Sequence, residues 1–151
     1  MSDQSMLNVI QFIATLATTL FAGAAVYINL VEHPARMECN TDIAHTVWAP
    51  SYKRAVPVMA SLAMIGFLAG FATWILGAGS LWLVASLLIL SVVPVTLLVI
   101  FPTNKLLLMP GRNIRSPETR SLLVKWGKLH AIRSALSLVA AAIYVWQLVA
   151  A

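Results

Sequence analysis

The stretch AVPVMASLAMIGFLAGFATWILGAGSLWLVASLLILSVVPVTLLVIFPTN, residues 55–104, contains no charged side chain. At about 20 residues for each membrane-crossing helix, it is long enough to cross a bilayer twice. The sequence Gly77-Ala78-Gly79-Ser80 divides it near its middle. We therefore predict two transmembrane helices in this stretch, at about residues 55–76 and 81–101.

Two further apolar stretches lie on either side of this pair. Residues 7–31 carry no charge, and residues 129–150 are interrupted only by His130 and Arg133. Of the 151 residues, 60% are hydrophobic and 10% are charged, whereas about a quarter are charged in an average soluble domain. The lengths fit helices, and no alternating pattern indicates barrel strands. The sequence predicts an all-α integral membrane protein, a four-helix bundle forming one domain over residues 1–151.

Basic residues are concentrated in two of the connecting segments. Those segments contain Arg36, Lys53 and Arg54 after the first span, and Lys105, Arg112, Arg115, Arg120, Lys125 and Lys128 after the third. By the positive-inside rule, both segments face the cytoplasm and both termini lie outside; we expect the plasma membrane of a bacterium. This topology signal explains the net charge of +5, so no nucleic-acid partner is needed.

The fourth helix is expected to begin well before the membrane. Ser116-Pro117-Glu118 combines a capping serine, a proline at the first helical position and an acid in the first turn. A helix over about 117–150, at about 1.5 Å per residue, is longer than a hydrocarbon core of about 30 Å. Its first turns should project into the cytoplasm. In the third span, Pro94 is expected to produce a kink.

Residues 36–54 are too few and too mixed in character for another domain. We expect them to lie along the membrane interface, where Trp48 and Tyr52 would be headgroup anchors.

Polar side chains from several spans should meet at the predicted cytoplasmic end. On the fourth helix, Trp126, His130 and Arg133 follow one another at spacings of four and three residues, so they share one face. Asn29 and His33 lie one turn apart on the first helix. The segment FPTN at the end of the third span reaches the same level. These residues predict a polar site between the helices.

Arg133 is the most informative of these residues. A cation about one turn inside the membrane boundary costs a few kcal/mol unless it is paired or reaches the headgroups. We predict that Glu32 is its partner. The pair could lock the first and fourth helices together or take part in function, and the sequence leaves both open.

His33 and His130 admit three interpretations. They could be structural, and because imidazole titrates near neutrality they could also transfer protons or ligate a metal. With Glu32 they would form a set of two histidines and one carboxylate, although no characteristic ligand spacing supports a metal site. The cofactor is left open, between none and a copper or iron ion.

Four motifs together resemble the anthrone oxygenase-like family, small four-helix membrane proteins most of which are catalogued as a domain of unknown function. The motifs are EHPAR after the first span, YKRA entering the second, FPTN ending the third and LLVKWGKLHAIR leading into the fourth. The matching positions are Glu32, His33, Pro34, Pro102, Thr103, Asn104, Trp126, His130 and Arg133. The resemblance implies oxidation of anthrones to anthraquinones by molecular oxygen, in a pocket for a planar substrate.

We therefore predict a membrane oxidoreductase of the oxygenase type that acts on a lipophilic phenolic or anthrone-like substrate near the cytoplasmic face. A histidine would remove a carbon-bound proton, and the resulting carbanion would reduce O2. The predicted catalytic residues are His33, His130, Arg133 and Asn104, and the predicted substrate contacts are Asn29, Trp126 and Tyr52. Membrane lipid, substrate and O2 are the expected partners, and a homo-oligomer is left open.

The alternative is a non-catalytic module for binding or transport. The polar ring and the basic loop residues would also suit a lipid headgroup or a small anion. A closed pocket favours the oxygenase, whereas a continuous polar path across the bilayer favours the alternative.

Overall fold

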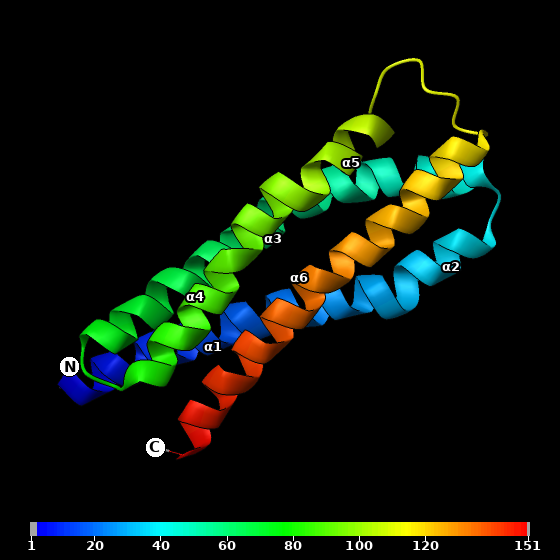
Figure 1. Cartoon of the computed structure of the whole chain (residues 1–151). Helices are drawn as coiled ribbons and strands as arrows, with labels where there is room; N and C mark the ends of the chain where they lie inside the picture. The colour runs from blue at the N-terminus through cyan, green and yellow to red at the C-terminus, as the bar shows by residue number, and fades with distance from the viewer. Residues whose placement is uncertain (1–2, 151) are drawn as a thin grey trace.

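Four long helical spans make up the part of the chain that the structure, a computed structural model, describes, residues 3–150. The elements are α1 (Asp3–Tyr27), the π-helix η1 (Ile28–Glu32), α2 (His33–Glu38), α3 (Thr41–Ile75), α4 (Ser80–Val95), the π-helix η2 (Thr96–Ile100), α5 (Phe101–Leu107) and α6 (Pro117–Ala150). We call residues 3–38 span 1, 41–75 span 2, 80–107 span 3 and 117–150 span 4. Figure 1 shows that α1 to α2 and α4 to α5 each continue as one rod.

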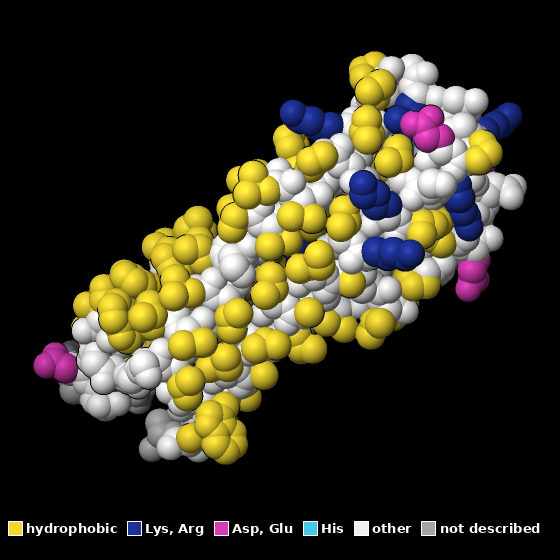
Figure 2. Space-filling view, in the orientation of Figure 1, with side chains coloured by type: hydrophobic (Ala, Val, Ile, Leu, Met, Phe, Trp, Pro, Cys, Tyr) yellow, Lys and Arg dark blue, Asp and Glu magenta, His cyan; other side chains and the backbone are white. Residues whose placement is uncertain are grey.

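Each span is long and apolar enough to cross a bilayer. Large apolar side chains cover the outer surface along the bundle, as Figure 2 shows. Leu30, Leu98 and Val149 are between 72% and 78% exposed, which in water would be costly for a surface of this extent. The prediction of an all-helical, four-span membrane protein is confirmed.

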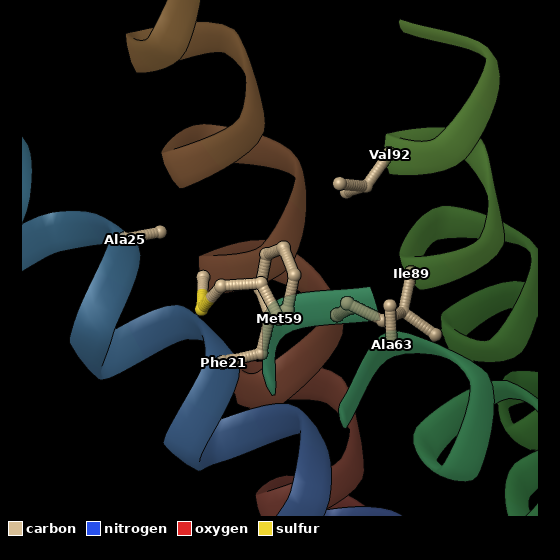
Figure 3. Close-up of a cluster of buried hydrophobic side chains, with 7 residues drawn as sticks. Phe21, Ala25, Met59, Ala63, Ile89 and Val92 are labelled. Atoms are coloured by element: carbon tan, nitrogen blue, oxygen red, sulfur yellow. The ribbon is translucent and has the colours of Figure 1, made fainter. Parts of the chain in front are cut away.

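The spans pack as an antiparallel ring. Span 1 contacts spans 2 and 4, and span 3 contacts the same two neighbours. Both termini therefore lie at one end, and the turns after α2 and α5 lie at the other (Figure 1). Figure 3 shows the central core, where Phe21, Met59, Ile89 and Val92 pack among alanines. Small side chains at such contacts let the helices approach closely.

Spans 1 and 3 share an irregularity near the loop end. The N–H of His33 bonds to the carbonyl of Ile28, and the N–H of Phe101 bonds to that of Thr96, five residues back in each case. Each π-helix is followed by a proline at the start of the next helix, Pro34 or Pro102. Proline has no N–H to donate, so the bonding pattern must change near it.

Span 2 differs from the prediction at its start. The expectation that residues 36–54 lie along the membrane interface is wrong, because α3 begins at Thr41 and continues through Pro50 and Pro57. Trp48 is fully buried rather than a headgroup anchor. Its ring stacks on that of Tyr52 with centroids 5.2 Å apart. An early helix start thus carries both aromatic rings into the bundle.

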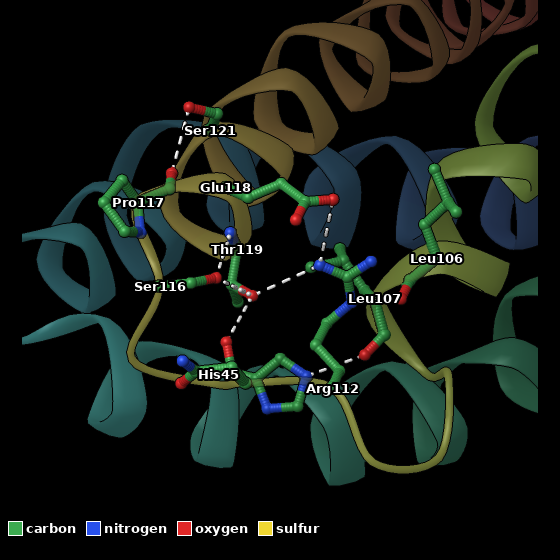
Figure 4. A network of polar contacts seen from close by, with 10 residues as sticks. His45, Leu106, Leu107, Arg112, Ser116, Pro117, Glu118, Thr119 and Ser121 are labelled. Carbon is green, nitrogen blue, oxygen red and sulfur yellow. Dashed lines mark hydrogen bonds and ion pairs between the residues drawn. The ribbon is translucent and has the colours of Figure 1, made fainter.

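Polar contacts fix the loop end of the bundle. The start of α6 is as predicted, since Ser116 Oγ accepts a hydrogen bond from the Thr119 N–H at 3.1 Å. In Figure 4, Arg112 lies close to Glu118 and donates to Thr119, while His45 Nε2 donates to the carbonyl of Leu107 at 2.8 Å. These contacts join α3, α5 and α6.

Candidate active site

A cavity of about 190 Å³ lies inside the bundle, between all four spans. Towards the termini it is apolar and is lined by residues of the core in Figure 3, among them Phe21, Met59 and Val92. Towards the loop end its lining includes Arg36, Trp48, Ser51, Tyr52, Trp126, His130 and Arg133. The cavity therefore suits a ligand with an apolar body and polar substituents.

His130 is held in one orientation by Asn29. The Asn29 Nδ2 donates to the carbonyl of Gly127 at 2.9 Å, which turns Oδ1 towards His130 Nδ1 at 2.6 Å. Ser134 Oγ also approaches Oδ1, at 2.5 Å. An amide oxygen only accepts, so the His130 Nδ1 must carry the proton. The neutral imidazole then keeps its lone pair on Nε2, and this is the tautomer of a general base.

Arg133 contacts an aromatic ring but no acidic side chain of the described residues. Its guanidinium lies 5.3 Å from the centroid of the Phe21 ring, and its side chain makes no hydrogen bond or ion pair within residues 3–150. The prediction that Arg133 pairs with Glu32 is wrong. Glu32 pairs with Arg36, one turn away on the same span, and accepts a hydrogen bond from Ser51 at 3.1 Å. Arg133 is left as an unpaired cation on the cavity wall.

Asn104 is connected to the cavity through a hydrogen bond to Tyr52. Asn104 is 1% exposed and does not line the cavity, but its Nδ2 donates to the Tyr52 hydroxyl at 3.1 Å. A hydroxyl that accepts this bond keeps its own proton to donate. The structure thus places Asn104 behind Tyr52, and Tyr52 on the cavity wall.

Trp126 lies between the two histidines. Its ring centroid is 5.1 Å from that of His33 and 4.8 Å from that of His130. His33 Nε2 donates to the carbonyl of Leu123 at 3.1 Å, and His33 does not line the cavity. His33 therefore joins spans 1 and 4 behind Trp126, whereas His130 faces the cavity.

The predicted metal ligands do not come together. Within residues 3–150, no three His, Cys, Asp or Glu side chains are grouped so that they could hold a metal ion. His33 and His130 pack on Trp126, and Glu32 is occupied by Arg36 and Ser51. The set of His33, His130 and Glu32 does not fit a metal in this geometry.

Some residues of the cavity lining are exposed on the outer surface of the bundle. Val56 and Leu97 line the cavity and are 45% and 56% exposed, and Ala60, which also lines it, is exposed as well. These residues belong to α3 and η2, on neighbouring spans.

The fold and the site define a four-span membrane protein with a buried cavity lined by histidine, arginine and tyrosine. The family model described as anthrone oxygenase matches residues 48–143, which is more than half of the chain, and the chain belongs to this family. The matched region includes Tyr52, Asn104, His130 and Arg133. No curated protein and no solved structure matched the chain.

Four residues have positions in the site that were not expected from the sequence. Arg36, Trp48 and Ser51 line the cavity, and Ser134 donates to Asn29. The spacing of Glu32 and Arg36, four residues apart on one helix, is a signal for their ion pair. For Ser51 and Ser134 no comparable pattern exists, because their roles depend on contacts with another span.

Proposed function

We propose that this protein is a membrane oxidoreductase that uses O2 to oxidise a lipophilic, planar phenolic or anthrone-like substrate. The site lies near the cytoplasmic face of what we take to be a bacterial plasma membrane. One observation carries the proposal: His130, held by Asn29 with its lone pair on Nε2, lines the same cavity as two groups that can donate hydrogen bonds, the Arg133 guanidinium and the Tyr52 hydroxyl. Family membership supports it.

The reaction begins with transfer of a proton from the substrate methylene carbon to His130 Nε2. The negative charge moves onto the ketone oxygen, where Arg133 and the Tyr52 hydroxyl donate to the enolate; such preorganised donors contribute about 3 kcal/mol each in other enzymes. The carbanion reduces O2, and a carbon–oxygen bond forms. Protonation gives a hydroperoxide, which loses water to become the second carbonyl. One O2 is consumed and one water is released for each anthrone oxidised.

The substrate would enter the cavity from the bilayer, between spans 2 and 3. Three lining residues of these spans, Val56, Ala60 and Leu97, are exposed on the outer surface of the bundle. An anthrone partitions into membrane, so it would arrive at these residues without crossing water. The apolar floor around Phe21 and Met59 would then take its unsubstituted ring.

The test is oxygen consumption by the purified protein in lipid nanodiscs with anthrone as substrate. Removal of a general base lowers the rate by about 10²- to 10⁴-fold, so we expect that loss for His130→Ala. His33→Ala should lower the rate less, because His33 lies behind Trp126. Full activity of a folded His130→Ala variant would contradict the proposal. Elemental analysis of both variants addresses a metal: equal loss of metal and activity in the two would favour ligation.

The second candidate is a non-catalytic membrane module for a lipid headgroup or a small anion. It is favoured by the unpaired Arg133 and by the basic side chains gathered at the loop end, which Figure 2 shows. Absence of oxygen uptake by a folded protein with any anthrone, together with binding of an anionic lipid, would favour this candidate.

A further inference from the structure

We propose that the cavity contains a second subsite, formed by Arg36, Trp48 and Trp126, that binds an oxyanion carried by the substrate away from its reacting carbon. This inference rests on the proposed function and specifies the substrate class. The substrate would be a planar aromatic molecule with an acidic substituent, a carboxylate or a phenolate.

Each of the three residues carries a buried N–H donor that has no hydrogen-bond partner among residues 3–150. Trp48 Nε1, Trp126 Nε1 and Arg36 Nε are buried and have no hydrogen-bond partner within the described part of the chain. Their side chains are 0%, 5% and 7% exposed, respectively, and all three line the cavity. Leaving a buried donor unpaired is costly, and such groups are uncommon in folded proteins. Three of them around one cavity indicate that a ligand accepts their bonds.

The donors are held in place by their neighbours. The rings of Trp48 and Trp126 meet edge to face, with centroids 5.8 Å apart. The Arg36 guanidinium is fixed by Glu32, which also accepts the Ser51 hydroxyl from span 2. A fixed set of donors is suited to bind an oxygen acceptor without further ordering.

The subsite lies one helical turn from the proposed reaction groups. Trp48 precedes Tyr52 by four residues on α3, and Trp126 precedes His130 by four residues on α6. One turn corresponds to roughly 5 to 6 Å along the axis. This separation fits two substituents on different rings of one fused aromatic system, with the acid towards the loops.

The charge of the cavity favours an anion over a neutral acceptor. Arg36 and Arg133 line it, and no carboxylate of the described residues does so. Glu32 balances Arg36, whereas Arg133 is unpaired. The same N–H groups could also donate to the phosphate of a phospholipid headgroup. The chemistry that the two ligands share is an oxyanion on an apolar body, and the experiment must separate the two sources.

The experiment measures binding of two non-oxidisable probes, anthraquinone-2-carboxylate and 2-methylanthraquinone, by equilibrium dialysis against the protein in phosphatidylcholine nanodiscs. Empty nanodiscs give the background. We expect the protein to prefer the carboxylate, and we expect Trp48→Phe and Arg36→Lys each to lower that preference by about tenfold, the loss typical of one hydrogen bond to a charged group. Trp48→Phe removes the N–H but keeps an aromatic ring. Arg36→Lys keeps a cation for Glu32.

Trp82→Phe is the matched control, since Trp82 is equally buried but stacks on Tyr144 and does not line the cavity. It should leave the preference unchanged. Equal binding of the two probes, or a preference unaffected by both Trp48→Phe and Arg36→Lys, would overturn the subsite. Displacement of the carboxylate by added phosphatidylglycerol would assign the donors to a lipid headgroup and overturn the substrate assignment. Because neither probe is turned over and unsubstituted anthrone lacks the acid, oxygen uptake with anthrone can fail or succeed independently of this result.

Discussion

His130 is made suitable for proton transfer by Asn29. The Asn29 amide donates to Gly127 and accepts from His130, so it selects the tautomer with the lone pair on Nε2. Without that acceptor the imidazole could rotate or carry its proton on Nε2. In the cavity, this would leave no base facing the substrate.

Asn29→Ala should therefore lower kcat by about 10- to 100-fold with a smaller change in KM, because the base is misoriented while the cavity wall stays intact. Asn29→Asp should recover part of kcat, since a carboxylate can still accept from Nδ1. Steady-state oxygen consumption measures both values. Asn8→Ala is a suitable control on the same span, because Asn8 is exposed and its side chain accepts a hydrogen bond from Gln4, far from the cavity lining. Equal losses for Asn29→Ala and Asn29→Asp would argue against a positioning role.

Asn104 offers a second test of how a neighbouring residue supports the site. It contacts Tyr52 and not the cavity, so its effect should depend on the Tyr52 hydroxyl. We expect Asn104→Ala to lower kcat/KM in the wild-type background and to have little effect in a Tyr52→Phe background. The double-mutant cycle gives the coupling energy, expected at about 0.5–3 kcal/mol for groups in direct contact. Simple addition of the two losses would instead indicate that Asn104 contacts the substrate directly.

The sequence could identify the main residues of the site but not their partners. Trp126, His130 and Arg133 follow from spacing on one helix, and the structure places all three on the cavity. The prediction that Glu32 pairs with Arg133 was wrong because Arg36 lies only four residues along the same span. At this spacing Arg36 can form the ion pair with Glu32 in place of a residue from another span. The bond from Asn29 to the Gly127 carbonyl leaves no sequence pattern, since any residue supplies a carbonyl.

At Gly127, the backbone of span 4 packs directly against the His33 ring of span 1. A Cβ at this position would lie 2.5 Å from His33 Cδ2 and 2.6 Å from its Nε2. These distances are too short for carbon, so the ring would have to move and weaken its bond to Leu123. The absence of a side chain at Gly127 lets the helices meet at the level of the site.

Gly127→Ala should destabilise the protein by about 1–3 kcal/mol, the cost typical of overpacking. Thermal unfolding in nanodiscs, followed by tryptophan fluorescence, gives the change. The control is Gly23→Ala, where nothing lies within 4 Å of the new Cβ, and alanine should be neutral or stabilising by up to about 1 kcal/mol. In a His33→Ala background the Gly127→Ala penalty should shrink. An undiminished penalty there would point to a clash elsewhere.

At the level of elements, hydropathy predicts the spans well and their ends poorly. The apolar stretches give the four helices, and the Ser116 cap gives the start of α6. The last turns of spans 1 and 3 and the first turns of span 2, at the loop end, are helical although they are polar. A polar segment can be either a loop or a helix that projects beyond the membrane, and polarity alone does not tell the two apart. The π-helices η1 and η2 are local changes of bonding near Pro34 and Pro102, and apolar periodicity does not report them.

The whole molecule has a strongly asymmetric charge distribution. Nine of the ten basic residues precede Arg133 in segments near the loop end, and the terminal end has none. Figure 2 shows this gathering of Lys and Arg towards one end of the molecule, with hydrophobic side chains along the rest of the visible face. The polar part of the cavity lies towards the same end as the basic residues. The side of the membrane that the basic end faces is therefore also the side of the polar part of the cavity.

By the positive-inside rule, the loop end should face the cytoplasm and both termini the outside. Cys39, the one cysteine of the chain, is exposed at the loop end, so its labelling reports directly which side of the membrane this end faces. We expect an impermeant thiol reagent to label Cys39 only after intact cells are permeabilised.

Two introduced cysteines test both ends of the bundle in a Cys39→Ser background. Asn113→Cys should behave like Cys39, whereas Ser80→Cys at the exposed start of α4 should label in intact cells. Labelling of Asn113→Cys from outside, with Ser80→Cys protected, would reverse the orientation and move the polar end of the cavity to the outer leaflet. The substrate would then have to be supplied from outside the cell.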